Sequence, residues 1–418
     1  MVAEQAETKR YFRIETAYAT GDPYDTYAWF RAHDPVHLGE PREGGHPAVH
    51  LFRHADVMRL LRDPRLGKEW HKLLPPDQQP PAPEPDSFHA VAQQFMLFRD
   101  PPTHTHLRGL ANLAFTAREV EKKRAAITEL ARDLGERFRD SARETPTDLI
   151  MDFAYPLPTL VIAQILGVPQ EDFPKFRQWA GDIGAAIDFQ LEGLEEQQAR
   201  VDQTSHELSE YFRWIFGVRR DDPQDDLISR LIHAETDGGQ LNEEEVIATC
   251  ILLLVAGHET TVNLIGNGTL ALMRHRDQWQ RLVDDPSLAR SATEELLRYD
   301  GPVQLTTRVA FADVELPDAP TIPAGSPVVY LLGSANRDDA AFPDGATLDI
   351  GRDVGRIMSF GMGIHFCLGA PLARLEGELA FHTLSTLMPD LAMADDHVTW
   401  RPGAVLHGLR ELPLQTAS

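Results

Sequence analysis

A short glycine-rich loop, "FGMGIHFCLG" at residues 360–369, constrains the fold of this chain more than any other stretch. It holds Cys367, one of only two cysteines in 418 residues, among glycines at positions 361, 363 and 369. Glycine permits close backbone approach and positive φ angles, and residues 370–388 have the apolar spacing of an amphipathic helix. Backbone N–H groups at the start of that helix would favour negative charge on the sulfur. We therefore expect a cramped loop that presents one thiolate.

The residues alone leave several uses of this cysteine open. A structural zinc site needs about four clustered ligands, and only His365 is near. Covalent attachment of a c-type haem needs a C-x-x-C-H motif, which the loop lacks, and a nucleophile needs a positioned base. An inert buried thiol is the ordinary case for a lone cysteine. Axial ligation of a haem iron is the remaining use, since the glycines would let the loop lie against a flat porphyrin.

The apolar periodicity predicts a mostly α fold with small β-sheets. Residues 24–33 and 54–63 have helical spacing, and helices continue almost without a break from about 104 to 299. The predicted strands are residues 35–40, 46–53, 303–316, 321–332 and 403–414. A stretch with six prolines in fourteen residues, 73–86, is predicted to be a long loop. We expect one catalytic domain over residues 1–418, with about 1–20 as a flexible segment.

Charge and hydropathy exclude two classes of partner. The net charge of −24 would repel a phosphate backbone, so no nucleic-acid partner is expected. The longest apolar run, residues 246–257, is shorter than the roughly 20 residues of a membrane helix, and no apolar signal segment begins the chain. Two cysteines far apart in sequence do not suggest a disulfide framework. We therefore expect no membrane partner and a cytoplasmic location.

Four residues of the loop match a specific signature. Phe360, Gly363, Cys367 and Gly369 fit the pattern F-x-x-G-x-x-x-C-x-G, and on this motif the chain resembles the cytochrome P-450 family. Further similar segments follow in the family's order: "DPPTHTHLR" at 100–108, "AGHETT" at 256–261, "EELLR" at 294–298 and "ANRDDAAFPDGATLDIGR" at 335–352. The resemblance covers about residues 24–412. It implies a long central helix over a haem, with α-rich and β-rich regions.

The resemblance also implies a cofactor and roles for individual residues. The cofactor would be non-covalent haem b, with Cys367 as the iron ligand. Its other contacts would be His104, Arg108, Ala256, Gly257, Arg308, Phe360, His365 and Gly369. Glu295 and Arg298 would form the buried pair that locks the haem-binding core.

Glu259 and Thr260 are the predicted catalytic residues. A threonine inside a helix often bonds the carbonyl four residues earlier, here Ala256, and an acid and an alcohol behind "CILLLVA" are costly to bury. The resemblance implies that Thr260 hydrogen-bonds the bound dioxygen. It places Glu259 in a water-linked proton relay.

The implied function is a haem-thiolate monooxygenase of the soluble bacterial class, active in secondary metabolism. It would insert one atom of O2 into an apolar small molecule by hydroxylation or epoxidation. No G-x-G-x-x-G opens a strand–helix unit, so electrons would come from a separate ferredoxin-type donor with its reductase. Basic residues Lys122, Lys123 and Arg124 form a candidate docking patch. Oxidative coupling, isomerisation, peroxide-driven chemistry and a haem-binding sensor remain alternatives.

The resemblance further implies a substrate pocket. It would include parts of 178–192, and Gln304 would be a polar anchor among apolar residues. The candidate lining residues are Phe88, Phe95, Phe98, Leu253, Ala256, Val303, Gln304, Leu305, Val405 and Leu406. Such a lining suits a terpenoid, polyketide, steroid or fatty acid.

Overall fold

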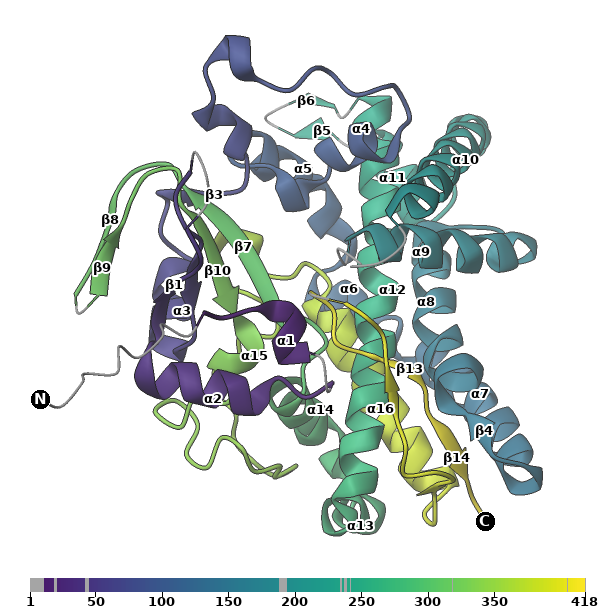
Figure 1. Cartoon of the computed structure of the whole chain (residues 1–418). Helices are drawn as coiled ribbons and strands as arrows, with labels where there is room; N and C mark the ends of the chain where they lie inside the picture. The colour runs from purple at the N-terminus through teal and green to yellow at the C-terminus, as the bar shows by residue number, and fades with distance from the viewer. Residues whose placement is uncertain are drawn as a thin grey trace, which may run out of the picture.

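A long helix, α12 (Glu243–Arg274), runs through the middle of the molecule (Figure 1). The computed structural model describes residues 11–18, 21–41, 45–187, 194–233, 235–236, 239–240, 242–317, 319–403 and 405–417. α12 begins at a capping box, in which Asn242 Oδ1 accepts from the Glu245 N–H and Glu245 Oε2 accepts from the Asn242 N–H, both at 2.9 Å. Most of its residues are buried, because other helices pack against it on several sides.

Helices make up most of the described chain, as predicted. Before α12 they are α1 (Ile14–Tyr18), α2 (Tyr24–His33), α3 (His54–Leu60), α4 (Phe88–Gln93), α5 (Thr103–Ala111), α6 (Ala117–Glu121), α7 (Arg124–Glu144), α8 (Pro156–Leu166), α9 (Phe173–Ile187), α10 (Leu194–Asp221) and α11 (Leu227–His233). After it come α13 (Arg276–Asp284), α14 (Ala289–Tyr299), α15 (Leu332–Ala335) and α16 (Ala370–Leu387). The proline-rich stretch is a loop that contains the short 3₁₀ turn η2 (Pro76–Gln78).

The largest sheet has five strands in the order β1-β2-β10-β7-β3, and β10 runs parallel to β2 but antiparallel to β7. Its strands are β1 (Val36–Leu38), β2 (Val49–Leu51), β3 (Leu66–Gly67), β7 (Leu305–Ala310) and β10 (Pro327–Leu331). The smaller sheets use β4 (Thr147–Asp148), β5 (Glu235–Thr236), β6 (Gly239–Gln240), β8 (Val314–Leu316), β9 (Ala319–Ile322), β11 (Ala392–Met393), β12 (Thr399–Trp400), β13 (Leu409–Glu411) and β14 (Pro413–Gln415). The predicted fold class, mostly α with small sheets, is confirmed.

The large sheet and the helical layers lie on opposite sides of α12. Figure 1 shows β1, β10 and β7 on the left, and α7, α8, α9 and α10 on the right. α14 and α16 pack against α12 and against each other, and they belong to the same hydrophobic core. The space between α12 and the sheet is where the site lies.

Part of the expected flexible N-terminal segment is ordered. Residues 1–10 lie outside the described residues, but Phe12 is buried and packs edge-on against Phe30 and Phe52. The Phe12 N–H donates to His37 Nε2 at 3.1 Å. Burial of this aromatic ring therefore anchors the chain at Phe12, just before α1, within the segment 1–20 for which flexibility is predicted.

The apolar run 246–257 lies within α12, as a buried core helix. α12 is long and apolar enough to span a membrane by length and composition, and 72% of its qualifying 18-residue window is buried inside the protein.

Candidate active site

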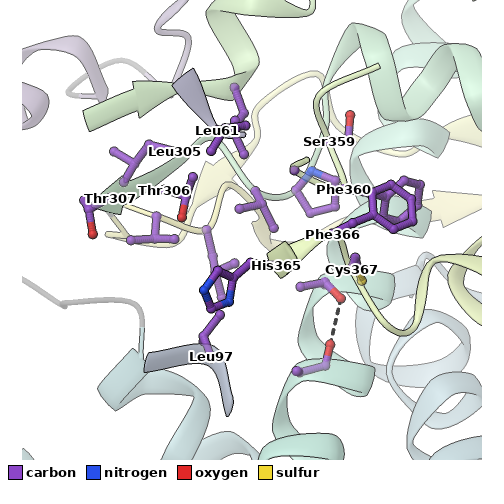
Figure 2. Close-up of a pocket in the computed structure, with 18 of the residues that line it drawn as sticks. Leu61, Leu97, Leu305, Thr306, Thr307, Ser359, Phe360, His365, Phe366 and Cys367 are labelled. Carbon is purple, nitrogen blue, oxygen red and sulfur yellow. Dashed lines mark hydrogen bonds between the residues drawn. The ribbon is translucent and has the colours of Figure 1, made fainter. Parts of the chain in front are cut away.

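The cysteine loop is shaped by glycines with positive φ angles. Gly361 and Gly363 have φ of +65° and +74°, and a Cβ on Gly363 would stand 2.6 Å from the Leu61 carbonyl oxygen. The Cys367 N–H donates to the Phe360 carbonyl at 2.9 Å, which closes the loop. α16 begins three residues after Cys367. The thiol is thus held at the wall of a cavity, as Figure 2 shows for Cys367 beside Phe360 and Phe366.

Two opposing effects act on the Cys367 thiol. Burial raises its pKa above the ordinary value. Backbone hydrogen bonds from Gly369 and Ala370 and the charges of Arg108 and Arg374 lower it. The backbone N–H groups of Gly369 and Ala370 already donate to the sulfur in the protein alone, so the loop is arranged to stabilise a thiolate.

A cavity of about 950 Å³ separates the cysteine loop from α12. Ala256, Gly257, Glu259 and Thr260 line its α12 side, and the Thr260 hydroxyl donates to the Ala256 carbonyl at 3.0 Å. The predicted hydrogen bond from the Thr260 hydroxyl to the carbonyl four residues earlier is therefore present. Ala256 is small, which leaves space over Cys367.

Glu259 has a cationic partner that the sequence did not reveal. Its Oε1 accepts a hydrogen bond of 2.9 Å from Arg401, which directly follows β12. Its buried Oε2 has no hydrogen-bond partner among the residues that the structure describes, and it lies 2.1 Å from the position that a Cβ on Gly184 of α9 would take. Burial raises the pKa of the Glu259 carboxyl, and Arg401 lowers it in part.

Basic side chains gather at one end of the cavity. The four predicted ones are His104, Arg108, Arg308 and His365, and all line it. The two imidazoles lie 4.3 Å apart between ring centroids, and within the described part of the chain both nitrogens of His104 and Nε2 of His365 are buried without a hydrogen-bond partner. Burial lowers the pKa of His365 to about 2, and the nearby cations add to this effect. Unpartnered imidazole donors and two guanidinium groups together suit an anionic ligand.

Glu295 and Arg298 lie together in the core, away from solvent. Arg298 Nε and Nη2 donate to the two Glu295 oxygens at 2.7 Å, and both side chains are fully buried. Arg298 Nη1 also donates to the carbonyls of Asn336 and Gly345, at 2.9 and 2.7 Å. The pair therefore ties α14 to the segment that precedes the cysteine loop.

Most predicted pocket residues face the cavity. They are Phe98, Leu253, Ala256, Val303, Leu305, Val405 and Leu406, and the remaining predicted haem contacts, Phe360 and Gly369, line it as well. From the predicted segment 178–192, Gly184 lines the cavity, and residues 188–192 lie outside the described residues.

Three predicted pocket residues lie elsewhere, which corrects the prediction. Gln304 is fully buried and donates to the Gly301 carbonyl at 2.8 Å and to the Tyr24 hydroxyl at 3.1 Å. It points away from the cavity because Val303 and Leu305, its neighbours in an extended segment, point into it. Phe88 and Phe95 pack against each other in the core instead of lining the cavity.

Two cavity residues, Lys68 and Glu376, were not among the predicted ones, whereas Leu97 and Thr306 lie in the predicted lining segments 88–98 and 303–306. Burial raises the pKa of Glu376 to about 8. Lys68 follows a two-residue strand, and Glu376 lies on the buried face of α16. Neither stood in a recognised motif, although an acid at a buried helix position is itself a signal.

The residues fit a haem. Cys367 bounds one face of the cavity, small residues of α12 bound the other, and unpartnered basic groups lie at the edge. Within the described part of the chain no three His, Cys, Asp or Glu residues gather as a metal site, which argues against structural zinc. Cys367 faces a cavity, so it is not a thiol buried in packing.

Comparison with known proteins gives one consistent result. The sequence pattern described as "Cytochrome P450" matches residues 52–385. The chain is 38% identical over 398 residues to the polyketide biosynthesis cytochrome P450 PksS of Bacillus subtilis, covering 94% of this chain and 95% of that protein. It is 40% identical over 397 residues to the vitamin D(3) 25-hydroxylase of Pseudonocardia autotrophica, covering 94% and 93%.

The chain belongs to the cytochrome P450 family. The crystal structure of P450BioI, in complex with acyl carrier protein carrying hexadec-9Z-enoic acid, superposes with a TM-score of 0.85 at 37% identity, covering 94% of this chain and 98% of that one. Cytochrome P450s bind haem b through a cysteine thiolate. This P450 is therefore a haem-thiolate monooxygenase that uses O2 and electrons from a redox partner.

Proposed function

We propose that Cys367 is the iron ligand of this P450 and that an apolar substrate binds between the cysteine loop and α12. The observation that carries the assignment is the thiol at the cavity wall, with the N–H groups of Gly369 and Ala370 on its sulfur. When bound, haem b with a thiolate ligand supplies the reductive cleavage of O2 and the transfer of one oxygen atom to the substrate.

Thr260 and Glu259 are the proposed proton-handling residues. Thr260 Oγ1 donates to Ala256, which leaves its lone pairs directed at the cavity for a proton from water. Glu259 is the residue next to Thr260, and its Oε2 has no hydrogen-bond partner among the described residues, so a proton can be held there and passed on. Burial raises the pKa of this carboxyl, which favours the protonated form that a proton donor needs.

The proposed substrate is an apolar molecule of medium or large size. Apolar side chains line much of the cavity, among them Met96, Phe98, Leu253, Val405 and Leu406. PksS belongs to polyketide biosynthesis and the Pseudonocardia enzyme is named for vitamin D(3). A polyketide or a steroid-like compound of secondary metabolism is consistent with this lining.

Replacing Cys367 by Ser tests the ligand assignment. We expect the reduced, carbon-monoxide-bound protein to show the strongly red-shifted absorption band of thiolate ligation, and we expect C367S to lose it together with monooxygenase activity. Cys250 is buried outside the cavity, so Cys250→Ser is the matched control and should keep the band. An unchanged band in haem-loaded C367S would refute the assignment.

A ferredoxin is the proposed electron donor, and residues 118–124 are its proposed docking patch. Arg124 donates to Glu378 of α16 at 2.7 Å, so the patch adjoins the helix that starts behind Cys367. Lys122 is also paired with Glu119 at 2.6 Å, which reduces the positive charge of the patch. An acidic partner would still be steered to this side.

Charge reversal at Lys122 and Lys123 tests the patch, with Arg124 kept because it joins α7 to α16. We expect reduction by ferredoxin to slow about tenfold at low salt and the difference to fade as salt rises. Reversal of the exposed Lys175, on α9, is the control. Equal reduction rates of the variant and the parent protein at every salt concentration would refute the proposal that this patch binds the ferredoxin.

We place the whole chain in one catalytic domain, located in the cytoplasm. The described helices and sheets pack around the same cavity, and the relatives are bacterial P450s. Fractionation of expressing cells would test the location.

A further inference from the structure

Gly184 is a glycine inside a helix whose backbone does not require one. It lies near the end of α9 and is not among the glycines with a positive φ angle. Alanine would favour a helix more than glycine does at such a position. The residue is buried and lines the cavity, and its helix packs against α12. The missing side chain therefore serves the contact between the two helices.

The space that a side chain at Gly184 would fill is taken by the carboxyl group of Glu259. A Cβ on Gly184 would lie 2.1 Å from Glu259 Oε2 and 3.2 Å from its Cδ, and the first distance is shorter than any real contact of a Cβ atom. Oε2 is buried and has no hydrogen-bond partner among the residues that the structure describes. The carboxyl group thus lies directly against the backbone of α9.

The other carboxyl oxygen is held by a residue whose backbone is itself fixed. Arg401 Nη1 donates to Glu259 Oε1 at 2.9 Å. The Arg401 N–H donates to the Gly408 carbonyl at 2.9 Å, and the Arg401 carbonyl accepts from the Gly403 N–H at 3.0 Å. These backbone bonds limit how far Arg401 can follow a movement of Glu259. The position of the carboxyl group therefore depends on the space at Gly184 and on Arg401 together.

Other charged or titratable groups approach this carboxyl from the neighbouring elements. They are Tyr155 directly before α8, Arg177 and Asp182 on α9, and His258 on α12. Asp182 accepts a hydrogen bond from Thr204 of α10 at 3.2 Å, and Tyr155 donates to the Arg177 carbonyl at 2.7 Å. Burial raises the pKa of Glu259, and the charge and hydrogen bond of Arg401 lower it. The contact with Arg401 is therefore the one that favours the ionised carboxylate.

We infer that Gly184 is a positioning residue, whose missing side chain lets the Glu259 carboxyl lie against α9 while Arg401 holds its other oxygen. The inference rests on the proposed function, because it takes Glu259 to be the proton-handling acid. A methyl group at position 184 would displace the carboxyl and break its hydrogen bond to Arg401. Since Oε2 is the free end of a flexible side chain, the displacement leaves the fold intact.

The experiment compares the purified holoprotein with Gly184→Ala. Gly181→Ala is the matched control, because a Cβ on Gly181 of the same helix would meet the Tyr155 hydroxyl at an ordinary 3.7 Å and Gly181 does not line the cavity. The readout is the infrared C=O band of the protonated Glu259 carboxyl, identified by its absence in Glu259→Gln and followed from about pH 4 to 9. Haem content, the carbon-monoxide band and thermal unfolding are measured on the same samples.

In G184A we expect the band to persist to higher pH than in the parent protein. The guanidinium of Arg401 stabilises the ionised form of Glu259, so a carboxyl that has moved away from it holds its proton more tightly. G181A should titrate like the parent protein. Both variants should keep their haem and their carbon-monoxide band, because the added methyl group is on α9 and not in the cysteine loop.

Glu259→Asp separates displacement of the acid from a general change in α9. Aspartate is one methylene group shorter, so its carboxyl would not reach the space beside position 184. The double variant G184A/E259D should therefore titrate like E259D alone. A change in the helix itself would instead shift the titration equally with glutamate or aspartate at position 259.

The inference is overturned if the titration of G184A is unchanged or moves to lower pH, or if G181A or the aspartate background shifts equally. Loss of haem or of folding in G184A would also overturn it. So would a parent protein that shows no band even at about pH 4, because a buried oxygen without a partner must then take up a proton.

The proton-handling role of Glu259 is tested separately. The infrared titration is made on the resting holoprotein, so it reports the position of the carboxyl whether or not Glu259 handles protons during turnover. E259Q that releases no more peroxide per electron than the parent protein would remove the proton role and leave the positioning by Gly184 standing. The two failures are therefore distinguishable.

Discussion

The cysteine loop and the α12 segment 256–260 face each other across the cavity, and different kinds of interaction hold them in place. The loop is fixed by its own backbone: Cys367 donates to Phe360, Gly361 donates to Met358, and two glycines supply the positive φ angles. The α12 segment depends on remote elements: Arg401 donates to Glu259 Oε1, and Gly184 of α9 lies close to Glu259 Oε2. One face is therefore specified locally and the other by tertiary packing.

This difference predicts how each face responds to substitution. A change within the loop should disturb its shape, since few alternative conformations satisfy its backbone. A change at the α12 face should leave the haem in place and alter proton handling, because the helix persists without the remote partner.

The largest effect is expected for Gly363→Ala in the loop. The added Cβ meets the Leu61 carbonyl oxygen at 2.6 Å, and the residue has a φ of +74°. We expect the stability of the holoprotein to fall by about 2–4 kcal/mol and the haem content to drop. Haem content by absorbance and thermal unfolding measure both.

Gly369→Ala is the matched control within the loop. Gly369 has a φ of −80°, and an added Cβ would find the Cys367 sulfur at an ordinary contact distance of 4.0 Å. It should therefore be tolerated far better than Gly363→Ala. Equal losses in the two variants would mean that backbone geometry does not shape this loop.

The difference between local and tertiary specification also explains which features the sequence could predict. The strands at 35–40 and 46–53, helix 24–33 and the helix after Cys367 follow from period and spacing, and the structure has them within a few residues. Cys367, Glu259 and Thr260 stand in local motifs. All three line the cavity.

Remote partners could not be predicted in this way. Arg401 lies 142 residues from Glu259, and Lys68 reaches Thr306 across 238 residues, through a sheet register that no local pattern encodes. Gln304 was misplaced for a related reason: it alternates with Val303 and Leu305 in an extended segment, and only the fold shows which side faces the cavity. Phe88 and Phe95 are aromatic like Phe98, but their neighbours place them in the core.

A smaller but specific effect is expected for Thr260→Ala on the α12 face. The methyl group cannot hold or pass a proton, so electrons should be released as peroxide while substrate binding and haem content stay unchanged. We expect the product formed per electron consumed to fall about tenfold, measured against peroxide release. This outcome would separate the two faces, since Gly363→Ala lowers haem content itself.

Thr249→Ala controls for removal of a threonine from α12. Thr249 is buried on the same helix but does not line the cavity, so coupling should be retained. Full coupling in T260A would count against the proton role of Thr260, as would equal uncoupling in both variants.

The smallest effect is expected for Arg401→Met, which tests directly whether a remote side chain controls the α12 face. Arg401 stabilises the ionised form of Glu259, while burial raises the pKa of that carboxyl. Without the guanidinium the Glu259 pKa should rise further, so the carboxyl stays protonated to higher pH. The limb of the pH profile that reports Glu259 should then move to higher pH, with haem content and the carbon-monoxide band unchanged.

Arg410→Met provides the control, because Arg410 is exposed on β13 of the same hairpin and is not part of the cavity lining. Product formation per electron is measured from about pH 5 to 9 for both variants. A limb that moves downward, or moves equally in R410M, would mean that Arg401 does not set the protonation of Glu259. A limb that moves up only in R401M shows that a residue 142 positions away tunes the α12 face, whereas backbone hydrogen bonds within residues 358–370 hold the cysteine loop.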